Sequence, residues 1–134
     1  MRHIASRGAA RLAALLMVAG GITTVTATAA AAPASASSCS WYWQDKDPGS
    51  SQVIHPVSGF SGIAMRTGPQ GYCDLVTRVP WGHWVTLDCF VHDGQPVNGV
   101  TTWSHVHYSN GGPVYSGWIS DYYLSGLGSG FNCA

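Results

Sequence analysis

Two histidines separated by one residue are the part of this sequence whose spacing most directly suggests chemistry. Because side chains alternate between the two faces of a strand, His105 and His107 would share one face. Either Asp88 or Asp93 could add a carboxylate. Two imidazoles and a carboxylate can hold zinc with one coordination position left open for water. The pair alone is a weak signal, and the interpretation we favour is two exposed strand histidines beside Trp103.

Other catalytic patterns are missing from the sequence. The chain has no glutamate, so it offers no pair of glutamic acids, and it has neither a Gly-x-Ser-x-Gly elbow nor a phosphate-binding loop. Cysteine–histidine catalysis needs a free thiol, which an even cysteine count disfavours. We therefore predict a protein that is not an enzyme and carries no cofactor. A small zinc-dependent hydrolase using His105 and His107 is the least favoured alternative.

The four cysteines predict disulfides. An even number of cysteines in a small exported domain is typical of a disulfide framework, and four cysteines allow three pairings. Cys73 and Cys89 lie symmetrically about the turn Pro80-Trp81-Gly82, so a hairpin would bring them opposite one another. The favoured pairing is thus Cys73–Cys89, with Cys39 and Cys133 joining the two ends of the chain.

The first 36 residues have the pattern of a secretory signal peptide. Arg2, Arg7 and Arg11 form a positive region, and a short apolar stretch rich in Leu, Ala, Val and Thr follows. It is too short and too rich in Gly and Thr for a membrane span. Ala34 and Ala36 supply the small-x-small pattern for cleavage after Ala36. We expect a secreted protein, extracellular or associated with the cell wall, with no membrane attachment after cleavage.

Removal of this leader changes the charge. Lys46, Arg66 and Arg78 then face six aspartates, so the formal net charge is 3 − 6 = −3 with histidines neutral. Three dispersed basic residues do not form the positively charged surface that binds nucleic acid, nor the basic patch that binds anionic membranes. The six Trp, six Tyr and three Phe all lie between Trp41 and Phe131. Some of these rings must fill the core, and others are candidates for a binding face.

Short alternating segments predict an all-β fold with one domain. Ile63 and Met65 should share one face of a first strand, and Val85 and Leu87 should point inward while Asp88 meets water. The predicted strands and the closing 3₁₀ turn span residues 62–66, 75–79, 84–90, 102–108, 115–119 and 120–124. An N-terminal extension (37–57) precedes a barrel (58–125), and a tail (126–134) with Cys133 follows.

Three phrases in order resemble the bacterial SH3 (SH3b) family. They are Arg66-Thr67-Gly68-Pro69 after a first strand, a central strand containing Trp103, and Gly117-Trp118-Ile119-Ser120 followed by Tyr122-Tyr123-Leu124. The resemblance implies a disulfide-stabilised, SH3-like β-barrel of about five strands. Departures, such as Ala64 where the family often has Asn, bear on binding specificity. In this family the turn diverges, which keeps the pairing Cys39–Cys73 with Cys89–Cys133 open.

The resemblance also implies a function. Domains of this family are typically binding modules of the cell envelope, and the implied ligand is a peptide of the cell wall peptidoglycan. An aromatic groove accepts extended peptides without strong charge. Candidate groove residues are Tyr72, Trp81, Trp84, Trp103, Tyr115 and Tyr122. The alternative is a secreted effector or inhibitor that binds another secreted or envelope protein. We expect a monomer.

Overall fold

The structure is a computed structural model that describes residues 38–134, so the predicted signal peptide lies outside the described residues. Six antiparallel strands form one sheet in the order β1-β4-β5-β6-β2-β3. The elements are β1 (Ser50–Gln52), β2 (Ile63–Arg66), β3 (Leu75–Val79), β4 (Trp84–Val91), β5 (Trp103–Tyr108), β6 (Tyr115–Ser120), η1 (Asp121–Tyr123) and η2 (Ser125–Leu127). No helix among the residues described is both long and apolar enough to cross a membrane.

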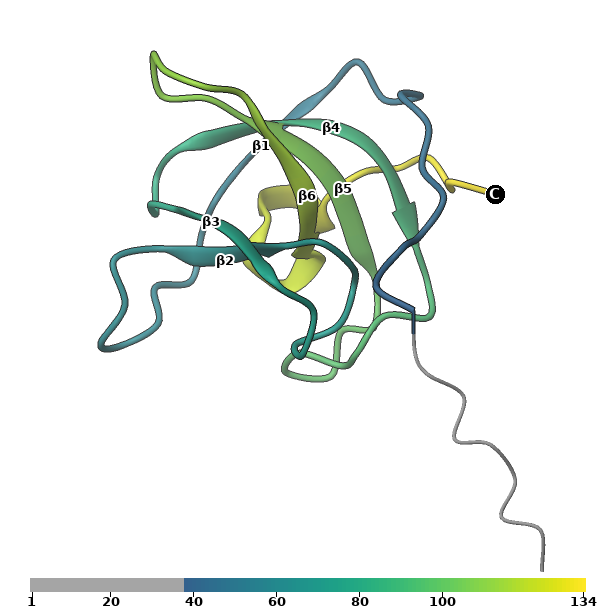
Figure 1. Ribbon diagram of the computed structural model, residues 1–134, viewed down its shortest axis with the longest axis horizontal. Helices are drawn as coiled ribbons and strands as arrows, with labels where there is room; N and C mark the ends of the chain where they lie inside the picture. The colour runs from purple at the N-terminus through teal and green to yellow at the C-terminus, as the bar shows by residue number, and fades with distance from the viewer. Residues whose placement is uncertain (1–37) are drawn as a thin grey trace, which may run out of the picture. The chain divides into compact units, whose positions relative to one another are not determined.

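The sheet is strongly bent. Figure 1 shows β2 and β3 running across the direction of β5 and β6. The strand order leaves β1 and β3 as the two edges, so the sheet is open, and a closed five-stranded barrel remains a prediction. The five predicted strands and the 3₁₀ turn are confirmed to within a residue or two at each end. β1 was not predicted, because three residues are too few to show an alternating pattern.

Each face of the sheet carries a hydrophobic cluster. The inner face holds the main core, in which Met65, Val106 and Ile119 have no exposed surface. Burial of a side chain of this size contributes about 1.5–3 kcal/mol. The inward positions predicted for Ile63, Met65, Val85 and Leu87 are confirmed. The outer face of β5 and β6 carries a second cluster built from Cys89, Trp103, Trp118 and Cys133, with Trp41 of the N-terminal extension packed against it.

All four cysteines form disulfides, but the favoured pairing is wrong. Cys39 is bonded to Cys73, and Cys89 is bonded to Cys133. The hairpin on which the favoured pairing depended does not form, because β3 pairs with β2 whereas β4 pairs with β1 and β5. Two disulfides fit an extracellular environment.

The bridges attach the two end segments to opposite parts of the sheet. Gly68 passes so close to the N-terminal segment that a Cβ atom there would lie 2.6 Å from the carbonyl oxygen of Cys39. At the other end, Phe90 and Phe131 share a backbone hydrogen bond of 2.7 Å, and the N–H of Cys133 donates to Phe90. The C-terminal segment therefore runs beside β4, and the extension covers the outer face of β5.

Candidate functional site

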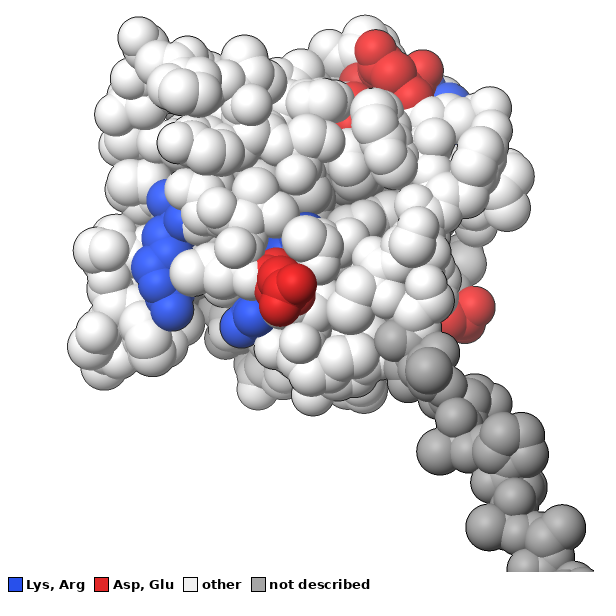
Figure 2. All heavy atoms as spheres, in the orientation of Figure 1, with Lys and Arg blue, Asp and Glu red and all other residues white. Residues whose placement is uncertain are grey.

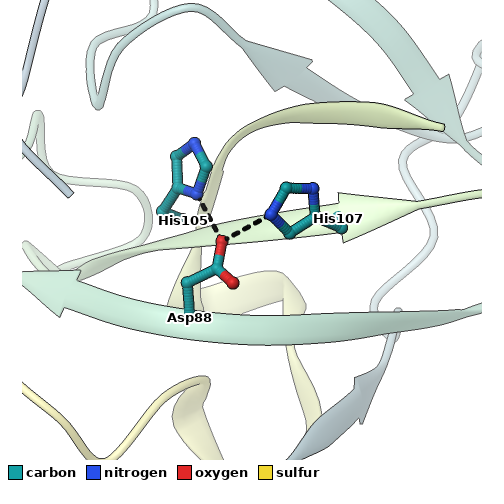
Figure 3. Close-up of side chains that lie close together, drawn as sticks. All are labelled: Asp88, His105 and His107. Carbon is teal, nitrogen blue, oxygen red and sulfur yellow. Dashed lines mark hydrogen bonds and ion pairs between the residues drawn. The ribbon is translucent and has the colours of Figure 1, made fainter. Parts of the chain in front are cut away.

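Three neighbouring strands bring a carboxylate, two imidazoles and a hydroxyl together on the outer face of the sheet. Asp88 Oδ2 lies 2.6 Å from Nδ1 of His105 and 3.1 Å from Nε2 of His107 (Figure 3). The other ring nitrogen of His105, Nε2, lies 3.2 Å from Oγ of Ser116. We call these four residues the serine–histidine cluster.

Asp88 lies on the outer face, as alternation from the inward Leu87 predicts. The register of β4 against β5 shifts between Leu87 and Cys89, so Cys89 lies on this face as well, opposite His105. The prediction that Asp88 meets water is wrong, because the N-terminal extension covers this face and only 2% of the residue is exposed. The prediction of two exposed histidines is wrong for His105, which is 3% exposed, whereas His107 is half-buried. Of the two carboxylates considered, Asp88 joins the histidines.

Aromatic rings hold the imidazole of His105 in place. Trp43 stacks on it with ring centroids 3.9 Å apart, and Trp118 meets it at an angle of 77°. Burial lowers the pKa of His105, although the hydrogen bond and the charge of Asp88 act in the opposite direction. The imidazole of His105 is therefore unprotonated near neutral pH.

The cluster has the residue types of a metal site but not its spacing. Asp88, His105 and His107 each offer a ligand atom, and these atoms lie within 4.8 Å of one another. Tetrahedral zinc with bonds of about 2.0–2.1 Å separates its ligand atoms by roughly 3.4 Å. The 2.6 Å contact between Asp88 and His105 is instead a short, charge-assisted hydrogen bond. Zinc would have to open this contact to bind.

A surface cleft gives access to one end of the cluster. It has a volume of about 290 Å³, and its lining includes His105, Ser116, Trp43 and Thr67. Asp88 and His107 do not line it. Ser116 is exposed, so a molecule in the cleft reaches the hydroxyl while the carboxylate stays covered.

A second candidate site is a pocket of about 230 Å³ beside β2 and β3, which we call the arginine pocket. Most of its walls are apolar, and they include Val57, Phe60, Ile63, Val97, Trp103 and Tyr123. Arg66 and Arg78 also line it, and no acidic residue does. Figure 2 shows the basic groups on this face of the molecule, with an acidic side chain beside them.

Each arginine of this pocket is positioned by one backbone contact. Nη1 of Arg66 donates to the carbonyl of Cys73 at 2.8 Å, and Nη1 of Arg78 donates to the carbonyl of Gly62 at 3.1 Å. The guanidinium of Arg78 also lies 4.3 Å from the centre of the Phe60 ring. A guanidinium has five N–H donors, so both arginines keep donors for a ligand.

A buried hydroxyl in the same pocket has no hydrogen-bond partner. Ser120 is 1% exposed, and its Oγ is the single such buried side-chain atom within residues 38–134. Because buried polar groups are almost always bonded, an orphan hydroxyl in a pocket wall is a position that a ligand group could satisfy.

The six aromatic residues predicted for the groove do not gather at one place. Trp103 lines the arginine pocket, but it is 4% exposed, and its Nε1 is bonded to the carbonyl of Gln95. Trp81, in the turn Pro80-Trp81-Gly82, is half-buried against the main core, and Tyr122 stacks on His55. The others are exposed, and none of them lines the arginine pocket: Tyr72, Trp84 and Tyr115.

Sequence reasoning missed several residues of the two sites. Arg66 and Arg78 could have been found, because they are the only arginines after the predicted leader. Ser116 and Trp43 gave no signal, since their roles depend on strand register and on the path of the extension.

Comparisons with known proteins identify no relative. No protein-family model, no curated protein and no solved structure matches the chain.

Proposed function

We propose that the protein is an exported SH3b-type binding module that takes the carboxylate-bearing end of a peptide in the arginine pocket. A stem peptide of the cell wall, which has free carboxylates, is the ligand class we favour. The observation that carries this proposal is the pairing of Arg66 and Arg78 in a mostly apolar pocket that no acidic residue lines.

Charge complementarity favours an anionic ligand group at this place. The chain after the predicted leader has three basic residues and six acidic ones, and two of the three basic residues line this one pocket. Arginine binds carboxylates through two parallel N–H donors, which gives geometric specificity as well as energy. The apolar walls can take a small side chain beside the carboxylate, and Ser120 Oγ can meet a polar atom of the ligand.

The test is calorimetric titration with a synthetic stem peptide that ends in a free carboxylate, and with the same peptide as its C-terminal amide. A charge-assisted hydrogen bond contributes about 1.5–3 kcal/mol, so the amide should bind at least about 10-fold more weakly. Arg78→Gln should lose a similar factor for the acid and little for the amide.

Lys46→Gln is the matched control, because it removes the same charge at a residue that contacts the C-terminal segment instead of the pocket. Equal affinity of acid and amide, or equal losses in both variants, would contradict the proposal. Binding to neither peptide nor to purified peptidoglycan would contradict the proposal and favour the alternative, a secreted effector or inhibitor that binds another protein.

A further inference from the structure

Ser116, His105 and Asp88 lie in the order hydroxyl, imidazole, carboxylate, and each ring nitrogen of His105 has one partner. We propose that Ser116 is the nucleophile of an acyl-transfer site that hydrolyses small esters. His105 is the general base, and Asp88 is a positioning residue. This activity is separate from peptide binding, because it uses a different cleft.

The contact between Asp88 and His105 selects the tautomer that the reaction needs. A carboxylate only accepts hydrogen bonds, so Nδ1 of His105 carries the proton and donates it at 2.6 Å. Nε2 then has a free lone pair, and it is this atom that lies 3.2 Å from Ser116 Oγ. A contact of this length permits proton transfer when it tightens around a substrate.

The surroundings of His105 fix the ring and leave the serine accessible. Trp43 covers one face of the imidazole at 3.9 Å, and Trp118 packs against it at 5.1 Å. His107 gives Asp88 a second partner at 3.1 Å, which restrains the carboxylate. Ser116 itself is exposed in the cleft, whose lining also includes Trp41, Trp43 and Trp118.

The strand pattern supplies a donor for the developing oxyanion. The N–H of Asp121 donates to the carbonyl of Thr102, which continues the β5–β6 ladder by one bond. With the observed register and the alternation of an antiparallel ladder, Gly117 exchanges its hydrogen bonds with Val106. The N–H of Ser116 therefore points away from β5, towards the side where β2 ends at Arg66. A backbone N–H of the nucleophile itself is a common oxyanion donor.

The reaction balances without a cofactor. Ser116 Oγ forms a bond to the ester carbonyl carbon, and its proton moves to Nε2 of His105. The bond from carbon to the alcohol oxygen then breaks, and the alcohol leaves with that proton. Water, deprotonated by Nε2, attacks the acyl-serine and releases the acid, and the proton returns to Ser116 Oγ.

The test is reaction of the purified protein with p-nitrophenyl acetate and, separately, with a fluorophosphonate probe. We expect about one equivalent of p-nitrophenolate in a burst, and a single phosphonylated serine that peptide mass spectrometry assigns to Ser116. Ser116→Ala should abolish both signals. Ser109→Ala, which removes an exposed hydroxyl from the turn after β5, should change neither.

Two further variants test the roles of the other residues. His105→Gln should lower the labelling rate by about 100-fold or more, the usual contribution of a general base. Asp88→Asn should lower the labelling rate of the protein that remains folded, as judged by near-ultraviolet circular dichroism. A purely structural Asp88 would change the folded fraction and leave that rate alone.

Three results would overturn the proposal. The first is labelling no greater than that of Ser116→Ala, and the second is a labelling rate that folded His105→Gln leaves unchanged. The third is labelling that a chelator abolishes and zinc restores, which would assign the chemistry to a metal held by Asp88, His105 and His107.

Discussion

Adjacent residues of β5 belong to two polar centres that differ in their access to solvent. Ser104 points inward, where its Oγ donates to Asp121 at 2.6 Å and accepts from the N–H of Ser129 at 2.9 Å. His105 points outward to Asp88 and Ser116. Both centres contain a buried carboxylate and a serine, but Ser104 has no exposed surface whereas Ser116 is exposed.

The difference shows which polar residues of a strand can act on a ligand. In the Ser104 centre the hydroxyl already has two partners, so the group joins the C-terminal segment to the sheet. In the serine–histidine cluster an unprotonated imidazole lies between the carboxylate and an accessible hydroxyl. Both centres have a serine and an aspartate. The serine–histidine cluster differs from the Ser104 centre because its hydroxyl is accessible to solvent and has an imidazole base beside it.

Removal of the disulfide Cys89–Cys133 should disturb the Ser104 centre more than the serine–histidine cluster. This bridge holds the segment that carries Ser129, and in the chain-entropy account a closed loop of this length contributes about 4 kcal/mol. In Cys89→Ala/Cys133→Ala, urea unfolding should show a loss of about that size. Amide exchange should accelerate at Ser129 and Gly130, and Ser116 labelling should stay within about twofold.

The matched variant is Cys39→Ala/Cys73→Ala, which opens a loop of similar length but releases the extension that carries Trp43. It should lose a similar free energy of unfolding while changing the labelling rate of Ser116. The same pattern of exchange and labelling in both double variants would contradict the separation of the two centres.

The pH dependence of stability should come in part from Asp121. Burial raises the pKa of Asp121 to about 6, despite hydrogen bonds from Ser104 and Thr102 that lower it. The folded state therefore binds a proton more tightly than the unfolded state, where the pKa is near 3.8. The stabilisation by the bound proton is fully present below pH 4. About 2–3 kcal/mol of the free energy of unfolding is lost as the pH rises through 6.

Asp121→Asn should remove that slope when urea unfolding is measured between pH 4 and 7. Asp45→Asn, at an exposed position, should keep it. Asp47 contributes with the opposite sign: burial acts to raise its pKa, but hydrogen bonds from Ser129, Gly49 and Gly130 outweigh this and lower it. Equal slopes in the wild type and in Asp121→Asn would show that Asp121 does not hold a proton in this range.

Local sequence patterns were sufficient for most of the fold. Alternation identified the strands around Met65 and Val85, and glycine and proline marked their ends. The predicted disulfide pairing was wrong because the true pairing depends on the divergence of β3 and β4. That divergence is a long-range property, and no local sequence pattern indicates it. Asp88 was placed in water because no local pattern shows that the N-terminal extension covers the outer face of β4 and β5.

The candidate sites were harder to predict for the same reason. The histidine pair was visible, but Ser116 meets His105 only through the register of β5 and β6. Trp43 comes from an extension that a disulfide draws across the sheet. Aromatic content suggested an aromatic groove, whereas the pocket in the structure is also lined by Arg66 and Arg78.

Trp43 offers the mildest way to distinguish the two centres, because its ring stacks on His105 of the serine–histidine cluster. Stacked aromatic rings contribute about 0.5–1.5 kcal/mol beyond their buried area, so Trp43→Ala should lower the free energy of unfolding by about 1 kcal/mol. It should also slow Ser116 labelling severalfold, since His105 loses the ring that holds it. Trp43→Phe should restore most of the rate, because a phenyl ring can still stack. Tyr42→Ala removes the neighbouring exposed ring and should change neither quantity. Normal labelling in Trp43→Ala would mean that Asp88 alone orients the imidazole.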